Sequence, residues 1–192
     1  VVKHAILHGP EFFSQLEGSI ADLNPQSVEQ FEPLVVRAAK VKVDVVNRDE
    51  REKQLRFVLN LGHTFGHALE EATGYSRFLH GEAVAWGLLA VTRLSERLGA
   101  MDPVTSARIR NLIFELGPLP GLKRIDPSRV VRLLSKDKKA IGGRIHWVIP
   151  ERIGKVRIRT GVPLRTAAAA LQDVMAGASD FTGAARGQDH RE

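Results

Sequence analysis

The sequence has 192 residues, of which 43% are hydrophobic, which is enough to form one hydrophobic core. It contains no cysteine, which excludes disulfide bonds and thiolate metal ligands and fits a reducing, cytoplasmic location. No apolar run approaches the ~20 residues of a membrane-spanning helix, so no membrane partner is expected. The net charge is +6, but the basic residues are scattered and aromatic residues are few. We therefore expect an anionic small molecule, and no nucleic acid, as the partner.

The N-terminal part is predicted to contain a short helix followed by a long one. The first six residues carry neither an initiator methionine nor a helix start signal. Residues 10–24 are predicted to hold a short helix that closes near Gly18. The longer helix follows, with Asn24-Pro25 as its cap and first turn or Ser27 as the alternative cap, and it runs to about Val46 or beyond.

An apolar stripe along the long helix includes a lysine. The stripe passes through Phe31, Val35, Ala38, Lys42 and Val45. This register predicts that Lys42 faces the core, where a lysine is costly unless it is paired or faces a cleft. The alternative is that its ammonium reaches solvent at the rim. The stripe continues to Asp49 and Glu52, although a charge run of this kind is usually a solvated face, and that alternative stays open for Glu52.

The stretch Leu59–Glu82 contains three of the seven histidines, His63, His67 and His80. His63 and His67 are four residues apart, which places both imidazoles on one face of a helix. Such a pair can reach one metal ion or one substrate. His80 follows a short connection and opens the next predicted helix, from which it can supply a third side chain. The alternative is a partly buried packing feature.

Two glycines, Gly62 and Gly66, flank the histidine pair within the predicted helix. Glycine inside a helix costs roughly 1 kcal/mol relative to alanine. The close approach of a ligand or of a second backbone explains such a cost most easily. Arg56 and Asn60 lie one turn apart just upstream and add a guanidinium and an amide near the same face. These features favour a functional site over simple packing.

Further helices are predicted after the histidines. The helix at 81–98 has apolar residues nearly all round, which indicates a central, buried helix closed by Gly99. Asp102-Pro103 opens another helix, which ends near Gly117. Asp126-Pro127 caps a third.

A ribbon and a last helix complete the prediction. Gly142-Gly143 marks a turn, and the segments 144–150 and 154–159 are predicted to pair as two strands. The alanine-rich segment 165–175 is predicted to be the last helix, and 176–192, which lacks periodicity, is predicted to be a disordered tail. The sequence has no glycine-rich turn between a strand and a helix of the kind that holds a dinucleotide.

The segment Arg56–Ala68, RFVLNLGHTFGHA, followed by His80–Val84, HGEAV, closely resembles the signature of the 3-dehydroquinate synthase family. Further similar stretches lie at Lys42, Asp49–Glu52, Asp137-Lys138-Lys139 and Ile153-Gly154. The similarity runs from residue 1 to about residue 162. It implies a mainly α fold, namely the C-terminal helical domain that binds metal and substrate, with a short two-stranded β ribbon. This domain would span residues 1–175, and the N-terminal nucleotide-binding domain would be absent.

The resemblance also implies roles for single residues. It implies that His63 and His80 are metal ligands and that a glutamate immediately before Val1 would be the third. His67 is implied as a proton-transfer group at the phosphate end of the substrate, and Glu52 as a proton acceptor. The implied substrate-binding residues are Lys3, Lys42, Arg56, Leu59, Asn60, His67 and Lys138, with Lys139 as an alternative to Lys138.

The implied reaction converts 3-deoxy-D-arabino-heptulosonate 7-phosphate to 3-dehydroquinate plus phosphate, a carbon–oxygen lyase step of the shikimate pathway. It implies zinc, or another divalent metal such as cobalt, and NAD bound mainly by the N-terminal domain. A homodimer is expected for the full-length enzyme, and an isolated C-terminal domain would be incomplete. Two alternatives stay open: a related sugar-phosphate cyclase, or an inactive domain fragment that serves binding or assembly only.

Overall fold

The computed structural model describes residues 1–24, 26–49, 55–140 and 144–182 of the chain. The described part is mainly helical with one two-stranded sheet, which confirms the predicted fold class. The elements in chain order are α1 (Val2–His8), α2 (Pro10–Ser19), η1 (Ile20–Asp22), α3 (Val28–Asp49), η2 (Leu55–Asn60), α4 (His63–Ala72), α5 (His80–Arg97), α6 (Pro103–Glu115), α7 (Pro127–Ala140), β1 (Trp147–Arg152), β2 (Lys155–Arg159) and α8 (Leu164–Thr182).

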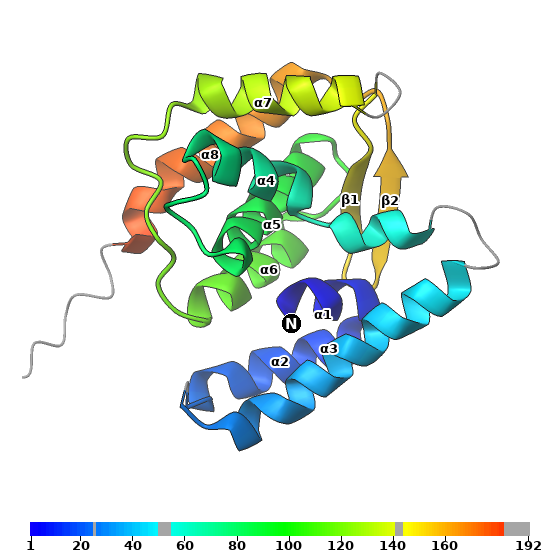
Figure 1. Cartoon of the computed structure of the whole chain (residues 1–192). Helices are drawn as coiled ribbons and strands as arrows, with labels where there is room; N and C mark the ends of the chain where they lie inside the picture. Colours follow the sequence, from blue (N-terminus) through cyan, green and yellow to red (C-terminus); the bar gives the residue numbers. More distant parts are fainter. Residues whose placement is uncertain (25, 50–54, 141–143, 183–192) are drawn as a thin grey trace, which may run out of the picture.

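Helix α5 is the centre of the fold. It contacts α4, α6, α8 and β1, and it lies between them in Figure 1. Its buried side chains point in all directions around the axis and include Val84, Trp86, Leu88, Leu89, Val91 and Leu94. The prediction of a central helix is therefore confirmed. Because α5 is held on all sides, its first residue, His80, has a fixed position relative to α4.

Helices α1, α2 and α3 form a layer below α5 in the view of Figure 1. Helix α1 forms although the sequence carries no helix start signal, because Ala5 and Ile6 are buried in the core. Phe12, Phe13 and Leu16 of α2 are fully buried as well. The layer is joined to the ribbon by a hydrogen bond of 2.8 Å from the Gly154 backbone N–H to the Ile6 carbonyl.

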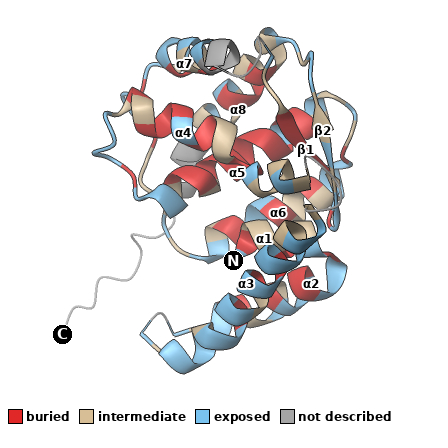
Figure 2. Ribbon diagram, turned by 45° about the vertical axis from the view of Figure 1, so that its right-hand side comes forward, coloured by how far each residue is buried: buried red, intermediate tan, exposed pale blue. Residues whose placement is uncertain are grey.

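Helix α3 begins directly after Ser27, the alternative cap, and continues to Asp49. Its buried residues are Leu34, Ala38 and Val41. Figure 2 shows most of the rest of α3 as exposed. Lys42 is exposed, so the prediction that it faces the core is wrong. Because α3 contacts only a few elements, mainly α1 and η2, one narrow stripe is buried, and that stripe is rotated away from the predicted one.

The predicted helix ends are confirmed by their capping contacts. The Asp102 carboxylate accepts a hydrogen bond of 2.8 Å from the Thr105 backbone N–H at the start of α6. Asp126 accepts one of 2.9 Å from the Ser128 backbone N–H at the start of α7. Gly99, which follows α5, has a φ of +65°, a left-handed conformation that glycine adopts without strain.

Strands β1 and β2 pair antiparallel, with Trp147 opposite Arg159, which confirms the predicted ribbon. The predicted turn at Gly142-Gly143 lies outside the described residues. Helix α8 continues to Thr182, so the prediction that it ends at Met175 is wrong. The helix packs along α5 and α7. Among the described helices, none has the length and apolar character that a bilayer crossing requires.

Candidate metal centre and substrate site

The backbones of α4 and α5 touch through three glycines. A Cβ atom added to Gly87 would lie 1.9 Å from the Gly62 carbonyl oxygen, and one added to Gly66 would lie 3.1 Å from the Ala83 carbonyl oxygen. Gly62 has a φ of +80° and precedes α4, so it is not inside the helix as predicted. Of the two explanations predicted for Gly62 and Gly66, a second backbone is the correct one. Their close packing holds the first turns of α4 against the N-terminal half of α5.

The three histidines of the predicted site are neighbours. His63 and His67 lie in the first turns of α4, and His80 is the first residue of α5. Their ring centroids are 5.4 Å apart for His63 and His67, 5.3 Å for His63 and His80, and 5.8 Å for His67 and His80. His67 and His80 are exposed and His63 is half-buried. One ligand or one ion can therefore contact imidazoles from both helices.

The Nδ1 atoms of two of these histidines have oxygen partners. His63 Nδ1 lies 3.1 Å from the Leu61 carbonyl oxygen, and His80 Nδ1 lies 3.2 Å from Glu70 Oε1. A carbonyl oxygen only accepts hydrogen bonds, so His63 Nδ1 carries the proton and its Nε2 is left as an electron-pair donor. The carboxylate of Glu70 favours the same tautomer of His80. This arrangement of an outer oxygen behind each imidazole is typical of metal-binding histidines.

Glu70 is a site residue that the sequence reasoning missed. It lies one turn after His67 on α4 and is only 8% exposed. One donor atom each from His67, Glu70 and His80 lie within 4.8 Å of one another, so these three side chains could also hold a cation directly. Its spacing of three residues from His67 is the signal that could have identified it, but a glutamate in a helix reads first as a good helix former.

The environment keeps His63 neutral. Burial, together with the positive charge of Lys3, lowers the pKa of His63 to about 4, against the raising effect of the Leu61 carbonyl. A neutral imidazole is the form that binds a metal ion. His63 can therefore bind a metal ion at neutral pH without first losing a proton.

Lys3 is anchored beside this cluster. Its Nζ donates a hydrogen bond of 2.8 Å to the Leu59 carbonyl oxygen, which joins two of the predicted substrate-binding residues. Burial, followed by the charge of nearby Lys42, lowers the pKa of the Lys3 ammonium. The positive charge of Lys42 also contributes to lowering the pKa of His4. Lys3 thus interacts electrostatically with both His63 and Lys42, although Lys42 is exposed.

The structure gives fewer contacts for the remaining predicted substrate-binding and catalytic residues. Arg56 forms an ion pair of 2.9 Å with Asp49, and the exposed Asn60 ends η2 next to the start of α4. Lys138 lies in α7, but its side chain is outside the described part of the structure, as is that of Lys139. Glu52 lies outside the described residues altogether. The roles of these residues stay predictions.

A cavity of ≈570 Å³ lies between α4 and α7. His67, Glu70 and His80 line one side of it, and Leu133 and Lys136 of α7 line the other. This volume suits a small-molecule ligand. Histidine and carboxylate groups face Lys136 across this space, and the Nζ atom of Lys136 lies 3.3 Å from Glu71 Oε1. Such donor groups fit a divalent ion.

Known proteins are similar to this chain in sequence and in fold. Residues 1–140 match the family described as 3-dehydroquinate synthase C-terminal. The chain is 40% identical over 162 residues to the 3-dehydroquinate synthase of Solibacter usitatus (strain Ellin6076) and 40% identical over 159 residues to that of Thermodesulfovibrio yellowstonii. These alignments cover 84% and 82% of the chain, but only 45% and 44% of the two relatives. The chain therefore spans about half the length of the curated relatives it matches.

Solved structures show the same architecture. A 2-epi-5-epi-valiolone synthase from Streptomyces hygroscopicus subsp. jinggangensis 5008, with NAD⁺ and Zn²⁺ bound, superposes with a TM-score of 0.77 at 27% identity, covering 90% of this chain and 48% of that one. A 2-deoxy-scyllo-inosose synthase complexed with carbaglucose-6-phosphate, NAD⁺ and Co²⁺ shares the fold with a TM-score of 0.75 at 21% identity, covering 90% of this chain and 49% of the other.

The helical arrangement thus places the chain in the class of the sugar-phosphate cyclases, and it covers about half the length of the matched structure. Within that class, the chain belongs to the 3-dehydroquinate synthase C-terminal family, as the histidine signature predicted.

Proposed function

We propose that this chain is the metal- and substrate-binding part of a 3-dehydroquinate synthase, which converts 3-deoxy-D-arabino-heptulosonate 7-phosphate to 3-dehydroquinate plus phosphate. The observation that carries the proposal is the convergence of His63, His67 and His80, with ring centroids 5.3 to 5.8 Å apart. His67 and His80 line the cavity, and His63 lies behind them near Lys3. The matched relatives bear that enzyme name.

In this proposal His63 and His80 hold a divalent ion through their Nε2 atoms. The Leu61 carbonyl and the Glu70 carboxylate orient the two rings by accepting hydrogen bonds from their Nδ1 atoms. Among the described residues, His67 Nδ1 has no oxygen partner. A ring that is not fixed in this way suits proton transfer better than metal binding. Zinc, when bound, supplies Lewis acidity toward a substrate hydroxyl.

The substrate is an anionic sugar acid phosphate, and the chain supplies cations for it. Lys3 is held in place by the Leu59 carbonyl, and Lys42 and Lys138 are the further candidates for the carboxylate and phosphate groups. Lys136 lies on the cavity wall and is a candidate that the sequence reasoning did not name. NAD, which accepts a hydride when bound, would be held mainly by the other half of the longer relatives.

Zinc binding by the 192-residue chain tests the metal site, using isothermal titration calorimetry at pH 7. We expect His63→Ala and His80→Ala to weaken binding at least 100-fold, and Glu70→Gln to weaken it 10- to 100-fold because an outer partner typically contributes that much. His8→Ala, which removes an exposed histidine of α1, is the matched control and should bind as the parent does. If His67→Ala abolishes binding while His63→Ala does not, then His67, Glu70 and His80 form the metal site instead.

Activity is tested on the complete gene product, by measuring NAD-dependent phosphate release from the heptulosonate phosphate with zinc present. We expect release that is lost in His80→Ala. Failure to release phosphate, combined with intact zinc binding, would contradict the dehydroquinate reaction and favour a related sugar-phosphate cyclase.

A further inference from the structure

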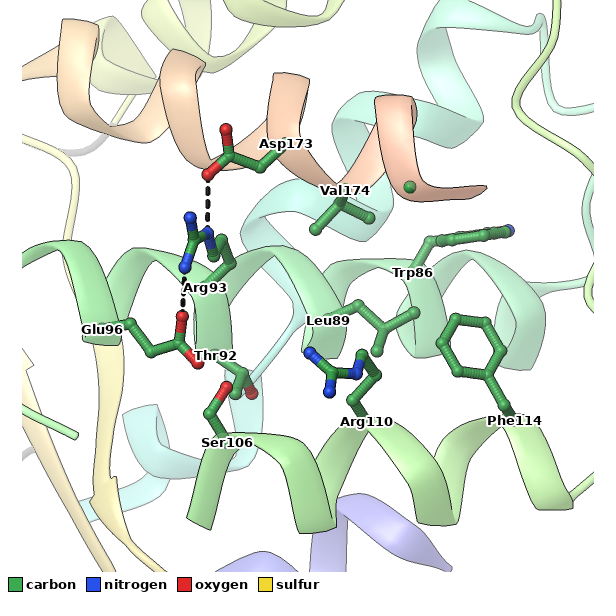
Figure 3. A pocket seen from close by; sticks show the side chains of 11 residues that line it. Trp86, Leu89, Thr92, Arg93, Glu96, Ser106, Arg110, Phe114, Asp173 and Val174 are labelled. Carbon is green, nitrogen blue, oxygen red and sulfur yellow. Dashed lines mark hydrogen bonds and ion pairs between the residues drawn. The ribbon is translucent and has the colours of Figure 1, made fainter. Parts of the chain in front are cut away.

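A second pocket lies away from the histidine cavity, between α5, α6 and α8 (Figure 3). Its volume of ≈340 Å³ is within the range of small-molecule sites. Trp86 and Leu89 of α5, Phe114 of α6 and Val174 of α8 form its apolar wall. The histidine cavity is lined by other residues, from α4 and α7 and from the start of α5. The pocket is therefore distinct from the site of the proposed reaction.

A buried hydroxyl in this pocket, that of Thr92, has no hydrogen-bond partner in the described part of the chain. Thr92 is only 3% exposed, and its Oγ1 is buried without a partner among the described residues. A helical threonine usually donates to a carbonyl of the preceding turn. Figure 3 shows the Thr92 side chain pointing from α5 toward α6, into the pocket that it lines. A buried polar group without a partner is unfavourable, so this hydroxyl is suited to a ligand that completes its hydrogen bonding.

One positive charge that lines the pocket, Arg110, has no ion-pair partner in the described part of the chain either. Arg93 is already held by Asp173, at 2.6 Å, and by Glu96, as the dashed lines of Figure 3 show. Arg110 extends from α6 into the same space, and no ion pair or hydrogen bond joins its side chain to the described part of the chain. A guanidinium presents paired N–H donors that match a carboxylate. Because Glu96 and Asp173 also line the pocket, a singly charged carboxylate fits better than a doubly charged phosphate.

We propose that this pocket binds a small monocarboxylate with an apolar body. The carboxylate pairs with Arg110 and accepts a hydrogen bond from Thr92, while the apolar body packs against Leu89, Phe114 and Val174. The ligand is recognised by this chain alone, because all of these groups come from its own helices α5, α6 and α8.

Nuclear magnetic resonance of the metal-free 192-residue chain tests the proposal with 3-phenylpropionate as the probe. The chain has two tryptophans, which give two indole N–H signals. The Trp86 indole donates to the Pro120 carbonyl at 3.0 Å and belongs to the pocket, whereas the buried Trp147 lies in β1. We expect a saturable shift of the Trp86 signal, with a dissociation constant on the order of 1 mM, and no shift of the Trp147 signal.

Three variants and a neutral probe separate the contacts. Arg110→Gln should weaken binding about tenfold by removing the charge-assisted pair, and Thr92→Val should weaken it about threefold. Arg129→Gln, which removes an exposed arginine of α7, is the matched control and should change nothing. The neutral amide 3-phenylpropanamide should bind about tenfold more weakly than the acid. Equal binding of acid and amide, an unchanged affinity in Arg110→Gln, or shifts that centre on the histidine signals would overturn the proposal.

Discussion

The junction of α4 and α5 and the long helix α3 are held to the fold in different ways. At the junction two backbones touch, and a single Cβ atom at Gly87 would meet the Gly62 carbonyl oxygen at 1.9 Å. Helix α3 rests on the fold through Leu34, Ala38 and Val41, while Val35 is 52% exposed. The junction therefore fixes the positions of the histidines through backbone contact, whereas α3 is attached only along one stripe of side chains.

The largest expected effect on stability is at the junction of α4 and α5. Gly87→Ala should lower the free energy of unfolding by about 3 kcal/mol, because the new methyl group overlaps backbone atoms that cannot rotate away. The same change should weaken zinc binding, since the two helices that carry the histidines must separate. Urea unfolding and calorimetry measure the two effects.

Gly18→Ala is the matched control for this change. Gly18 lies in α2, and an added Cβ there meets no atom within 4 Å. The substitution should raise the free energy of unfolding by about 0.5 to 1 kcal/mol, because alanine loses less backbone entropy than glycine. Equal effects of the two substitutions would show that α4 and α5 are not in backbone contact.

Neighbouring residues of α3 give the next largest effect. Leu34→Ala should lower the free energy of unfolding by about 2 to 3 kcal/mol because Leu34 is 5% exposed. Val35→Ala, at an exposed position, should change it by less than about 0.5 kcal/mol. Urea unfolding of both variants tests which stripe is buried. A larger cost for Val35→Ala would restore the originally predicted register.

The smallest expected effect concerns His4 of α1, which is influenced by charges from both regions. Burial, followed by Lys3, lowers the pKa of His4 from 6.5 to about 4. Between these pH values the unfolded chain binds a proton that the folded chain does not, so the free energy of unfolding falls as the pH falls from 6.5 toward 4. His4→Phe keeps the ring volume and removes the titration.

Urea unfolding at pH 7 and pH 5 measures this contribution. The variant should lose about 1 kcal/mol less than the parent chain between the two pH values, after allowance for solvent screening of the half-buried ring. An identical pH dependence in both proteins would contradict the low pKa of His4.

The features that the sequence predicted well are those that depend on neighbouring residues. The caps at Asp102 and Asp126 are local hydrogen bonds, and the helical spacing of His63 and His67 is a property of one turn. The approach of His80 was predicted from the short connection that brings it to the start of the next helix, while the glycines left open whether a ligand or a second backbone lies close. Local chemistry was sufficient in each case.

The features that the sequence predicted poorly depend on contacts between elements that are distant in the sequence. The exposure of Lys42 depends on which face of α3 meets α1 and η2, and this contact is not local to the helix. The spacing of Glu70 from His67 within α4 places it on the histidine face, but its contact with His80 depends on how α5 packs against α4.

The hydrogen bond between Gly154 and Ile6 has a consequence for how the chain folds. It joins α1 to the ribbon, nearly the full length of the described chain apart, and a Cβ on Gly154 would lie 2.9 Å from the Gly9 Cα atom. Contacts between such distant segments close a long loop and slow folding. Residue 6 is synthesised well before residue 154, so the Ile6 carbonyl can accept this hydrogen bond only after the ribbon has left the ribosome. The contact between α1 and the ribbon is therefore expected to form late in the folding of this chain.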